Sequence, residues 1–569
     1  MRSTYSLRAL KISAGAVALA VMQICACAQT AATFGGTCPR FASGSLVPEP
    51  PNLYSQNGVL TVSLSYNTTT NSAGLTLFCF TTSSGLESPT LHVHPGDTLT
   101  INVKNNLPAP TSAGSMAPVT NASTVCGAAT QNASSLNIHY HGTNTSPTCH
   151  SDEVIHTLIN SGQSFTYNIV FPSDEPPGLY WYHPHVHGLA EAAVQGGASG
   201  AIVVQGIQNV QPAVAGLPER ILIIRDQPVP ASTPDPNGTA PSWDVTMNYV
   251  PILFPNFKPA LLAMRPGEKQ FWRVSNSAAD TIIDLQLQFD GVPQTLQIVG
   301  LDGVPTGSQD GSSQGKLVPK TDIRIPPAGR AEFIVTGPSA SVKKATLFTL
   351  GIDTGPDGDN DPQRPLISIV TDRNAPEPTL SEGPVSGAPG PQRFAGLATA
   401  APTRSRLLYF SEDNPNAQFF ITGDGQKPVL FSANNPPAIT TTQGSVEDWT
   451  IQNRTLENHE FHMHQIHFLL LARNGVPVAP ADQQFLDMVE IPFGTGAPPY
   501  PSVTVRMDFR GPDIGDFVYH CHILQHEDEG MMAIIRVLPN AANAKPAVKP
   551  SVQPAPVDTK KTVEGAPNY

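Results

Sequence analysis

Residues 517–532, FVYHCHILQHEDEGMM, set one cysteine between two histidines and add a third histidine and two methionines downstream. Successive side chains of a β-strand point to opposite faces of the sheet. If this segment is a strand, His520 and His522 share one face and Cys521 lies on the other. Such a strand could serve two metal sites at once, one with a thiolate ligand and one with imidazole ligands.

Short strand-like runs dominate the rest of the chain, for example SFTYNIVF at 164–171, RILIIRD at 220–226 and SVTVRMDF at 502–509. They are rich in Val, Ile, Thr and Phe and are bounded by Gly, Pro, Asn and Asp, whereas long stretches of helical periodicity are absent. With 569 residues the chain is too long for one core. We therefore expect an all-β protein of several sandwiches or barrels.

Changes in composition divide the chain. Residues 374–403 are rich in Pro, Gly and Ala and predict a linker. The residues after Pro539 are rich in Pro, Ala and Lys and predict a disordered tail. The predicted boundaries are 1–28 for a leader, 33–205 for a first unit, 206–373 for a second unit, 374–403 for the linker, 404–538 for a third unit and 539–569 for the tail.

The N-terminus has the pattern of an export signal. Basic residues precede an apolar run over residues 12–24, and small residues at 26 and 28 suit cleavage before Gln29. The sequence ICAC is also an imperfect lipobox, so a lipoprotein anchor at Cys27 stays open. No other apolar run approaches the roughly 20 residues that span a bilayer. We expect an exported protein, periplasmic or extracellular.

Five cysteines remain after the leader. An exported protein oxidises paired thiols, so Cys38, Cys79, Cys126 and Cys149 could form two disulfides in any of three connectivities. Proximity in the sequence favours Cys126–Cys149. Cys521 is then left over, and it is the cysteine between the two histidines.

Histidine is distributed unevenly. All 16 histidines lie in residues 92–187 or 459–526, and the second unit has none. If the histidines act together, the first and third units must meet around them. Four clusters stand out, which are HYH at 139–141, HPHVH at 183–187, HEFHMH at 459–464 and HCHILQH at 520–526.

Strand alternation sorts these clusters into two ligand sets. Eight imidazoles suit three metal ions, with two ligands on one ion and three on each of the others. The eight histidines expected on one face are His139, His141, His183, His185, His462, His464, His520 and His522. The other set has one thiolate, two imidazoles and a distant thioether, the ligands of a blue-copper site: Cys521, His459, His526 and Met531. His467 continues the parity of its cluster, and we expect it to pack or hydrogen-bond there.

In these residues the chain resembles the multicopper oxidase family, the laccase-like proteins with three cupredoxin domains. The family's four copper motifs have counterparts in HYHG (139–142), YWYHPHVHG (180–188), HEFHMH (459–464) and HCHILQHEDEGM (520–531), and the likeness covers roughly residues 35–538. The resemblance implies three consecutive cupredoxin-like Greek-key domains, with no copper ligand in the second. Tyr140 stands where many members have tryptophan, and Glu460 where many have proline; neither is a ligand position.

The resemblance also implies four coppers per chain. By this likeness the type 1 copper is held by His459, Cys521, His526 and Met531, the type 2 copper by His139 and His462, and the type 3 pair by His141, His183, His185, His464, His520 and His522. A methionine axial ligand resembles members of lower potential. Glu527 resembles the family's proton-donating acid, and Asp152 resembles, more loosely, its other acid beside the cluster; we expect both to be catalytic.

The implied reaction oxidises a reductant one electron at a time and reduces O2 to water. Phenols and aromatic amines are the expected reductants. Two alternatives stay open. One is a metallo-oxidase for Cu(I) or Mn(II) in metal tolerance, and the other is a copper-binding or electron-carrier protein that never reduces O2 and needs only the type 1 ligands.

The charge of the chain limits its partners. It has 32 Lys and Arg against 45 Asp and Glu, and the net charge of −13 disfavours nucleic acid or an anionic membrane. An acidic surface suits metal cations and neutral or cationic substrates. Residues 353–362, DTGPDGDNDP, alternate aspartates like a calcium loop but lack the closing glutamate, so we expect an acidic turn there.

Overall fold

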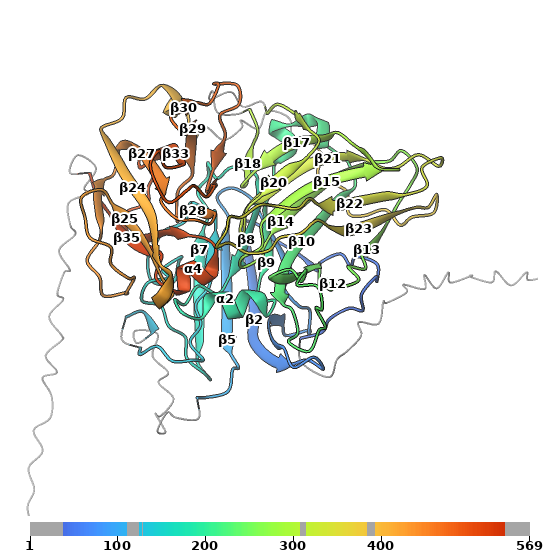
Figure 1. Ribbon diagram of the computed structural model, residues 1–569, viewed down its shortest axis with the longest axis horizontal. Coiled ribbons are helices and arrows are strands. Elements are labelled where there is room, and N and C mark those ends of the chain that lie inside the picture. Colours follow the sequence, from blue (N-terminus) through green and yellow to red (C-terminus); the bar gives the residue numbers. More distant parts are fainter. Residues whose placement is uncertain (1–37, 111–124, 128, 308–314, 384–392, 541–569) are drawn as a thin grey trace, which may run out of the picture.

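Figure 1 shows the computed structural model of the chain, which describes residues 38–110, 125–127, 129–307, 315–383 and 393–540. Strands are the dominant regular structure; they form six sheets, and the helices are short. This confirms the prediction of an all-β fold. The predicted leader and the tail beyond residue 540 lie outside the described residues.

The first two sheets take their strands from residues 52–204. Along β2 the buried residues Leu60, Val62, Leu64 and Tyr66 alternate with more exposed ones, so one face of the sheet covers a core. One sheet has the order β3 (Thr76–Thr82), β2 (Val59–Thr70), β5 (Thr98–Asn105) and β7 (Ser164–Val170). The other has the order β1 (Asn52–Tyr54), β4 (Thr90–Val93), β9 (Gly200–Val204), β8 (Gly178–His183) and β6 (His139–His141).

The next two sheets take their strands from residues 219–371. One runs β12 (Val250–Ile252), β11 (Trp243–Met247), β10 (Glu219–Pro228), β14 (Lys269–Asn276), β21 (Arg330–Thr336), β17 (Leu296–Leu301) and β18 (Val304–Pro305), with β19 (Val318–Lys320) on β17. The other runs β13 (Ala260–Met264), β23 (Arg364–Thr371), β22 (Ala345–Thr349), β15 (Ile283–Phe289) and β16 (Val292–Pro293), with β20 (Ile323–Ile325) on β15. Nearly all residues of β14 and β21 are buried on both faces, because their outer face packs against β8.

The last two sheets take their strands from residues 404–538. One runs β25 (Gln418–Gly423), β24 (Arg404–Asp413), β27 (Val446–Asn453), β33 (Ser502–Asp508), β29 (Phe468–Arg473) and β30 (Val476–Pro477), with β31 (Phe485–Leu486) on β29. The other runs β26 (Ile439–Thr442), β35 (Met532–Leu538), β34 (Gly515–Cys521), β28 (His459–Met463) and β32 (Met488–Ile491). The division of the chain into three domains at the predicted boundaries stays a prediction.

The helices are short and sit between strands. Those whose bounds fall within the described residues are α2 (Ala190–Gln195), α3 (Ile207–Val210) and α4 (Leu524–Asp528), with single 3-10 turns η1 (Pro212–Val214), η2 (Leu397–Thr399) and η3 (Asn414–Asn416). None of the helices in the described ranges has the length and apolar character that crossing a membrane requires.

Two disulfides join the cysteines of the N-terminal third. They are Cys38–Cys79 and Cys126–Cys149, so the pairing favoured by proximity is confirmed. Cys521 is a free, buried thiol.

The second half of the predicted linker is packed. Phe394 and Leu397 are buried in one cluster with Val446, Leu469 and Phe485, which belong to the sheet that contains β27, β29 and β31. Residues 393–400 therefore contribute to a core, although their composition predicts a simple connection.

Candidate metal centre

The four histidine motifs lie on two pairs of neighbouring strands. In the first unit β6 pairs with β8, so that His139 is opposite His183. In the third unit β28 pairs with β34, so that His462 is opposite His520 and Phe461 is opposite Cys521. Each unit thus brings two of its motifs together through its own sheet register.

Strand alternation orients fewer of these histidines than the sequence pattern predicts. Only HYH lies wholly in a strand. The strands that carry His183, His462 and His520 end before the next cluster histidines, which are His185, His464 and His522. After His183 the chain meets Pro184, which has no N–H to donate to a ladder. After β28 the backbone turns at Gln465, whose φ is 60°. These three later histidines are therefore directed by a loop or by the strand end.

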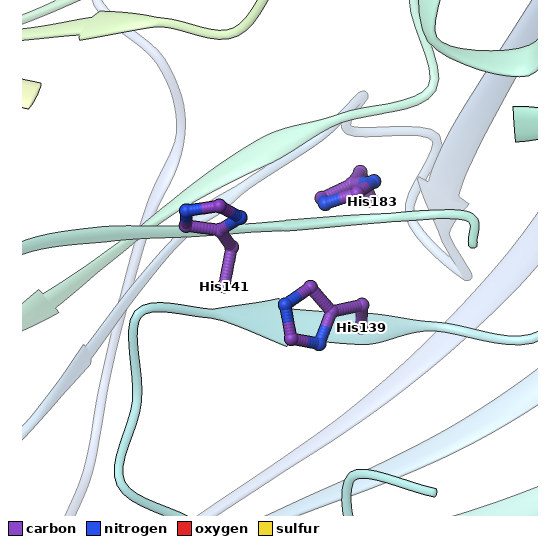
Figure 2. Close-up of side chains that lie close together, drawn as sticks. All are labelled: His139, His141 and His183. Atoms are coloured by element: carbon purple, nitrogen blue, oxygen red, sulfur yellow. The ribbon is translucent and has the colours of Figure 1, made fainter. Parts of the chain in front are cut away.

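All eight histidines of the predicted cluster nevertheless meet in one buried site, and none is more than 1% exposed. Rings from the first and third units stack on each other, with centroids 3.8 Å apart for His139 and His464 and 4.0 Å apart for His141 and His462. Figure 2 shows His139, His141 and His183 turning their rings toward one another. The structure thus brings the first and third units together around the histidines, as predicted.

Three imidazole nitrogens converge on a single point. The Nε2 atoms of His185, His464 and His520 lie 3.1 to 3.4 Å from one another. Three nitrogen ligands about 2 Å from one metal ion, in tetrahedral directions, are about 3.3 Å apart. The spacing therefore fits a metal ion at their centre.

Other ring nitrogens of the cluster are buried without a hydrogen-bond partner among the described residues. Buried polar groups are normally paired, so each such atom needs an explanation. The unpaired atoms include His139 Nε2, His141 Nδ1, His183 Nε2, His462 Nε2 and both ring nitrogens of His522. Metal ligation accounts for one such nitrogen on each of these rings.

The opposite ring nitrogens hold the imidazoles in place. The Nδ1 atoms of His183, His462 and His520 lie 2.8 to 2.9 Å from the carbonyl oxygens of Pro184, Asp487 and Cys521 respectively. These contacts select the tautomer whose Nε2 is free to ligate. Burial lowers the pKa of all three rings well below the usual range, which keeps them neutral and ready to ligate.

Asp152 and Glu527 lie where the sequence predicts. Asp152 Oδ1 is 3.0 Å from His139 Nδ1 and accepts the N–H of Tyr140 at 3.1 Å. Glu527 is fully buried, and its two oxygens lie 3.6 Å from His185 Nδ1 and 3.2 Å from His520 Nδ1. Burial raises the pKa of Glu527 well above its usual range.

A second cluster lies on the other side of β34. Its three donor atoms are Cys521 Sγ, His459 Nδ1 and His526 Nδ1, with separations of 3.6 and 3.7 Å from sulfur to nitrogen and 3.1 Å between the nitrogens. Met531 is fully buried beside them, and its carbonyl accepts the N–H of Cys521 at 3.1 Å. The four predicted blue-copper ligands are thus neighbours, and one tripeptide joins this cluster to the eight histidines.

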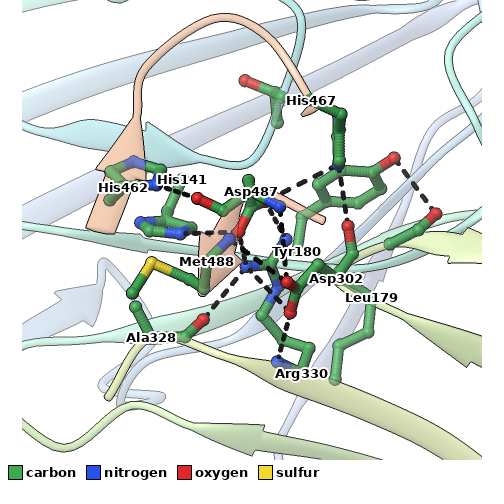
Figure 3. Close-up of polar contacts among 12 residues, drawn as sticks. His141, Leu179, Tyr180, Asp302, Ala328, Arg330, His462, His467, Asp487 and Met488 are labelled. Carbon is green, nitrogen blue, oxygen red and sulfur yellow. Dashed lines mark hydrogen bonds and ion pairs between the residues drawn. The ribbon is translucent and has the colours of Figure 1, made fainter. Parts of the chain in front are cut away.

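Asp487 and Arg330 also lie at the site, although no motif of the sequence predicts them. Asp487 lies between His141 and His462, with its Oδ1 3.3 Å from His141 Nε2 and its carbonyl oxygen 2.8 Å from His462 Nδ1. Arg330 of β21 donates to both carboxylate oxygens of Asp487, as Figure 3 shows. His467 hydrogen-bonds the carbonyl of Asp302 at 2.8 Å, which confirms its predicted role as a hydrogen-bonding residue. The only signal for Asp487 was an acid inside the apolar run FLDMV.

A cavity of about 330 Å³ opens beside the second cluster. His526 reaches its wall and stacks on Phe419, with ring centroids 4.3 Å apart. Six acids and no Lys or Arg line the cavity, and three of the acids come from the predicted acidic turn: Asp280, Asp357, Asp359, Asp361, Glu457 and Glu529. Glu457 Oε1 lies 3.3 Å from His526 Nε2. The cavity therefore offers negative charge next to a cluster ligand.

Comparisons with known proteins agree with this geometry. Two family models described as multicopper oxidase match residues 125–209 and 399–541. A laccase of Bacillus subtilis (strain 168) is 23% identical over 394 residues, which cover 64% of this chain and 71% of that protein. The multicopper oxidase MmcO of Mycobacterium tuberculosis is 21% identical and matches 86% of each chain. A solved structure described as a multicopper oxidase from Campylobacter jejuni, a metallo-oxidase, has a TM-score of 0.63 at 21% identity and covers 88% of this chain and 96% of that chain.

Proposed function

This chain belongs to the laccase-like multicopper oxidases, and we propose that it couples one-electron oxidation of a phenol or aromatic amine to the four-electron reduction of O2 to water. Family membership makes it a copper-dependent oxidoreductase with O2 as electron acceptor. The reductant, the number of coppers and the residues that hold them are the proposed part.

We assign four coppers to the two clusters. His459, Cys521, His526 and Met531 would hold the type 1 copper, and His139 and His462 the type 2 copper. The type 3 coppers would be held by His185, His464 and His520 on one side and by His141, His183 and His522 on the other, in line with the contacts among these rings. When bound, copper supplies one-electron transfer at the first site and O2 reduction at the other three.

The observation that carries this proposal is the tripeptide 520–522. Cys521 belongs to one cluster, while His520 and His522 belong to the other, and all three are fully buried. Electrons could therefore pass between the clusters through two peptide links. An electron carrier needs only the cluster around Cys521 and gives no reason for eight further buried imidazoles, seven of which have an unpaired ring nitrogen.

Oxygen uptake by copper-loaded protein tests the proposal. With a phenolic reductant we expect one O2 consumed for every four electrons, no accumulated peroxide, intense blue absorption and a copper content near four per chain. An electron carrier would consume no O2 beyond background, and that outcome would reject the proposal.

The two buried acids have distinct proposed roles. Asp152 orients His139 through a hydrogen bond, as carboxylates do for metal-binding histidines. Glu527 has no described hydrogen-bond donor on its oxygens and lies against His185 and His520, so it can hold a proton beside the site of O2 reduction.

Replacing Glu527 with glutamine keeps the size of the side chain and removes the transferable proton. We expect turnover to fall about 10- to 100-fold, the range found when partners of metal ligands are changed. Anaerobic bleaching of the blue colour by substrate should keep its rate, and only reoxidation by O2 should slow. If bleaching slows equally, Glu527 acts on the type 1 side or on folding, and its proposed role is wrong.

The acidic cavity favours a second candidate, in which the reductant is a cation such as a metal ion or a protonated amine. Six carboxyl groups beside His526 would concentrate positive charge where electrons enter. Asp357 is exposed and Glu529 half-buried, so both can meet a solute from solvent. The metallo-oxidase alternative therefore rests on a specific observation.

Neutralising exposed acids of this cavity separates the two candidates. Each unit charge about 4 Å from a cationic substrate is worth about 1 kcal/mol in water, or about fivefold in KM. We expect Asp357→Asn to raise KM for a cationic reductant by roughly that factor and to leave KM for a neutral phenol unchanged. Asp482→Asn, an exposed acid outside the cavity, is the matched control. Equal effects of both substitutions on KM would show that the general surface charge, and not the cavity, attracts the cationic reductant.

We also propose that the protein is exported. Two disulfides suit an oxidising compartment, and the N-terminal pattern is that of an export signal.

A further inference from the structure

The backbone N–H of Glu460 points at the sulfur of Cys521. The distance from Glu460 N to Cys521 Sγ is 3.3 Å, and both residues are fully buried. Among the described residues, this is the one backbone N–H that donates to that sulfur.

The sheet register produces this contact. Phe461 is paired with Cys521, and the carbonyl of Glu460 accepts the N–H of His522 at 2.8 Å. The N–H and C=O of one strand residue point to the same side, so the N–H of Glu460 also faces β34. This N–H donates to the sulfur of Cys521 instead of to a backbone carbonyl of β34. Many multicopper oxidases have proline at this position, and proline has no N–H to donate.

We infer that the Glu460 N–H raises the reduction potential of the type 1 site by hydrogen-bonding the Cys521 thiolate. This inference rests on the proposed function, which makes Cys521 a copper ligand. A hydrogen bond to an ionised acceptor is stronger than one between neutral groups. The reduced site leaves more negative charge on the sulfur, so the N–H stabilises the reduced state more than the oxidised state.

The hydrogen bond opposes the effect of the axial ligand. Met531 resembles the axial ligand of members with lower potential, whereas an N–H donor at the sulfur shifts the potential upward. The presence of glutamate at position 460, where many family members have proline, thus affects the reduction potential through the backbone N–H. The Glu460 side chain lies on the opposite face from that of His459, by strand alternation, and is not needed for the contact.

Two variants separate the backbone from the side chain. Glu460→Pro removes the N–H and costs no ladder bond, because that N–H meets sulfur. Glu460→Gln keeps the N–H and the size of the side chain. In a redox titration of the blue absorption, we expect Glu460→Pro to shift the equilibrium toward the oxidised form at least tenfold, which is about 59 mV for one electron. Glu460→Gln should shift it less than threefold.

A second measurement does not depend on the proline variant folding. In wild-type protein produced in D2O, the Cu–S stretching bands of the resonance Raman spectrum should shift, because the donor carries deuterium. Glu460→Gln should show the same isotope shift. Absence of the shift in the wild type would overturn the inference.

The remaining outcomes are distinguishable. Wild-type protein without blue absorption would overturn the proposed function and this inference together. Blue wild-type protein with an unchanged potential in Glu460→Pro would overturn only the inference. Equal shifts in both variants would assign the effect to the carboxyl group and would also overturn it.

Discussion

Replacing Cys521 with serine should abolish oxidase turnover and leave the protein folded. Serine is slightly smaller than cysteine and has no soft sulfur ligand, so the proposed type 1 site would lose the donor on which its colour would depend. The side chain is fully buried beside Phe461 and Met531, and the change removes no hydrophobic contact larger than one sulfur atom. We expect O2 uptake at background, no intense blue band, and a copper content lower by about one per chain.

The measurement compares two variants of the second cluster with one control variant outside both clusters. Cys521→Ser should block electron transfer between reductant and O2, whereas Met531→Leu should keep it, because the thioether is only the distant ligand of the set. Cys126→Ser, paired with Cys149→Ser, removes a disulfide outside both clusters and controls for general loss of cysteine. Full turnover in Cys521→Ser would show that electrons reach the histidine cluster by another path.

The sequence was sufficient to predict the members of both clusters, because each motif that contributes ligands is a short stretch of consecutive residues. Each motif spans a few residues, and the ligand types themselves indicate the metal. The predicted meeting of the first and third units also holds, although His464 and His522 are directed by strand ends and not by alternation. The sequence therefore predicted which residues meet. It predicted less well the backbone conformation that directs their side chains into the clusters.

Beyond Asp152 and Glu527, the support around the clusters could not be predicted, because it depends on contacts between distant segments. Asp487 contacts His141, which is 346 residues away in the sequence, and Arg330, which is 157 residues away. The middle unit has no histidine, so nothing in its composition indicates that β21 reaches the site. Likewise, the acidic turn at 353–362 was predicted as such, but its place beside His526 follows only from the packing of the second unit on the third.

Replacing Arg330 with methionine should destabilise the protein by about 3–5 kcal/mol, the range for removing one partner of a buried ion pair. Arg330 and Asp487 are both 0% exposed. The guanidinium also donates to the carbonyls of Leu179 and Ala328, so it joins the first, second and third units at one point. Without it, the Asp487 carboxylate stays buried beside His141 with no cation to balance its charge.

The matched control is Arg324→Met, because Arg324 forms an ion pair with two hydrogen bonds to Glu490 across the same units but is 38% exposed. Exposed ion pairs contribute about 0.2–1 kcal/mol, so this variant should change the free energy of unfolding little. Asp487→Asn combined with Arg330→Met removes both charges and should recover part of the loss. Because Asp487 orients His141 and His462, Arg330→Met should also lower the copper content, measured on folded protein at low temperature. Equal free energies of unfolding for the Arg330 and Arg324 variants would show that the buried ion pair does not hold the three units together.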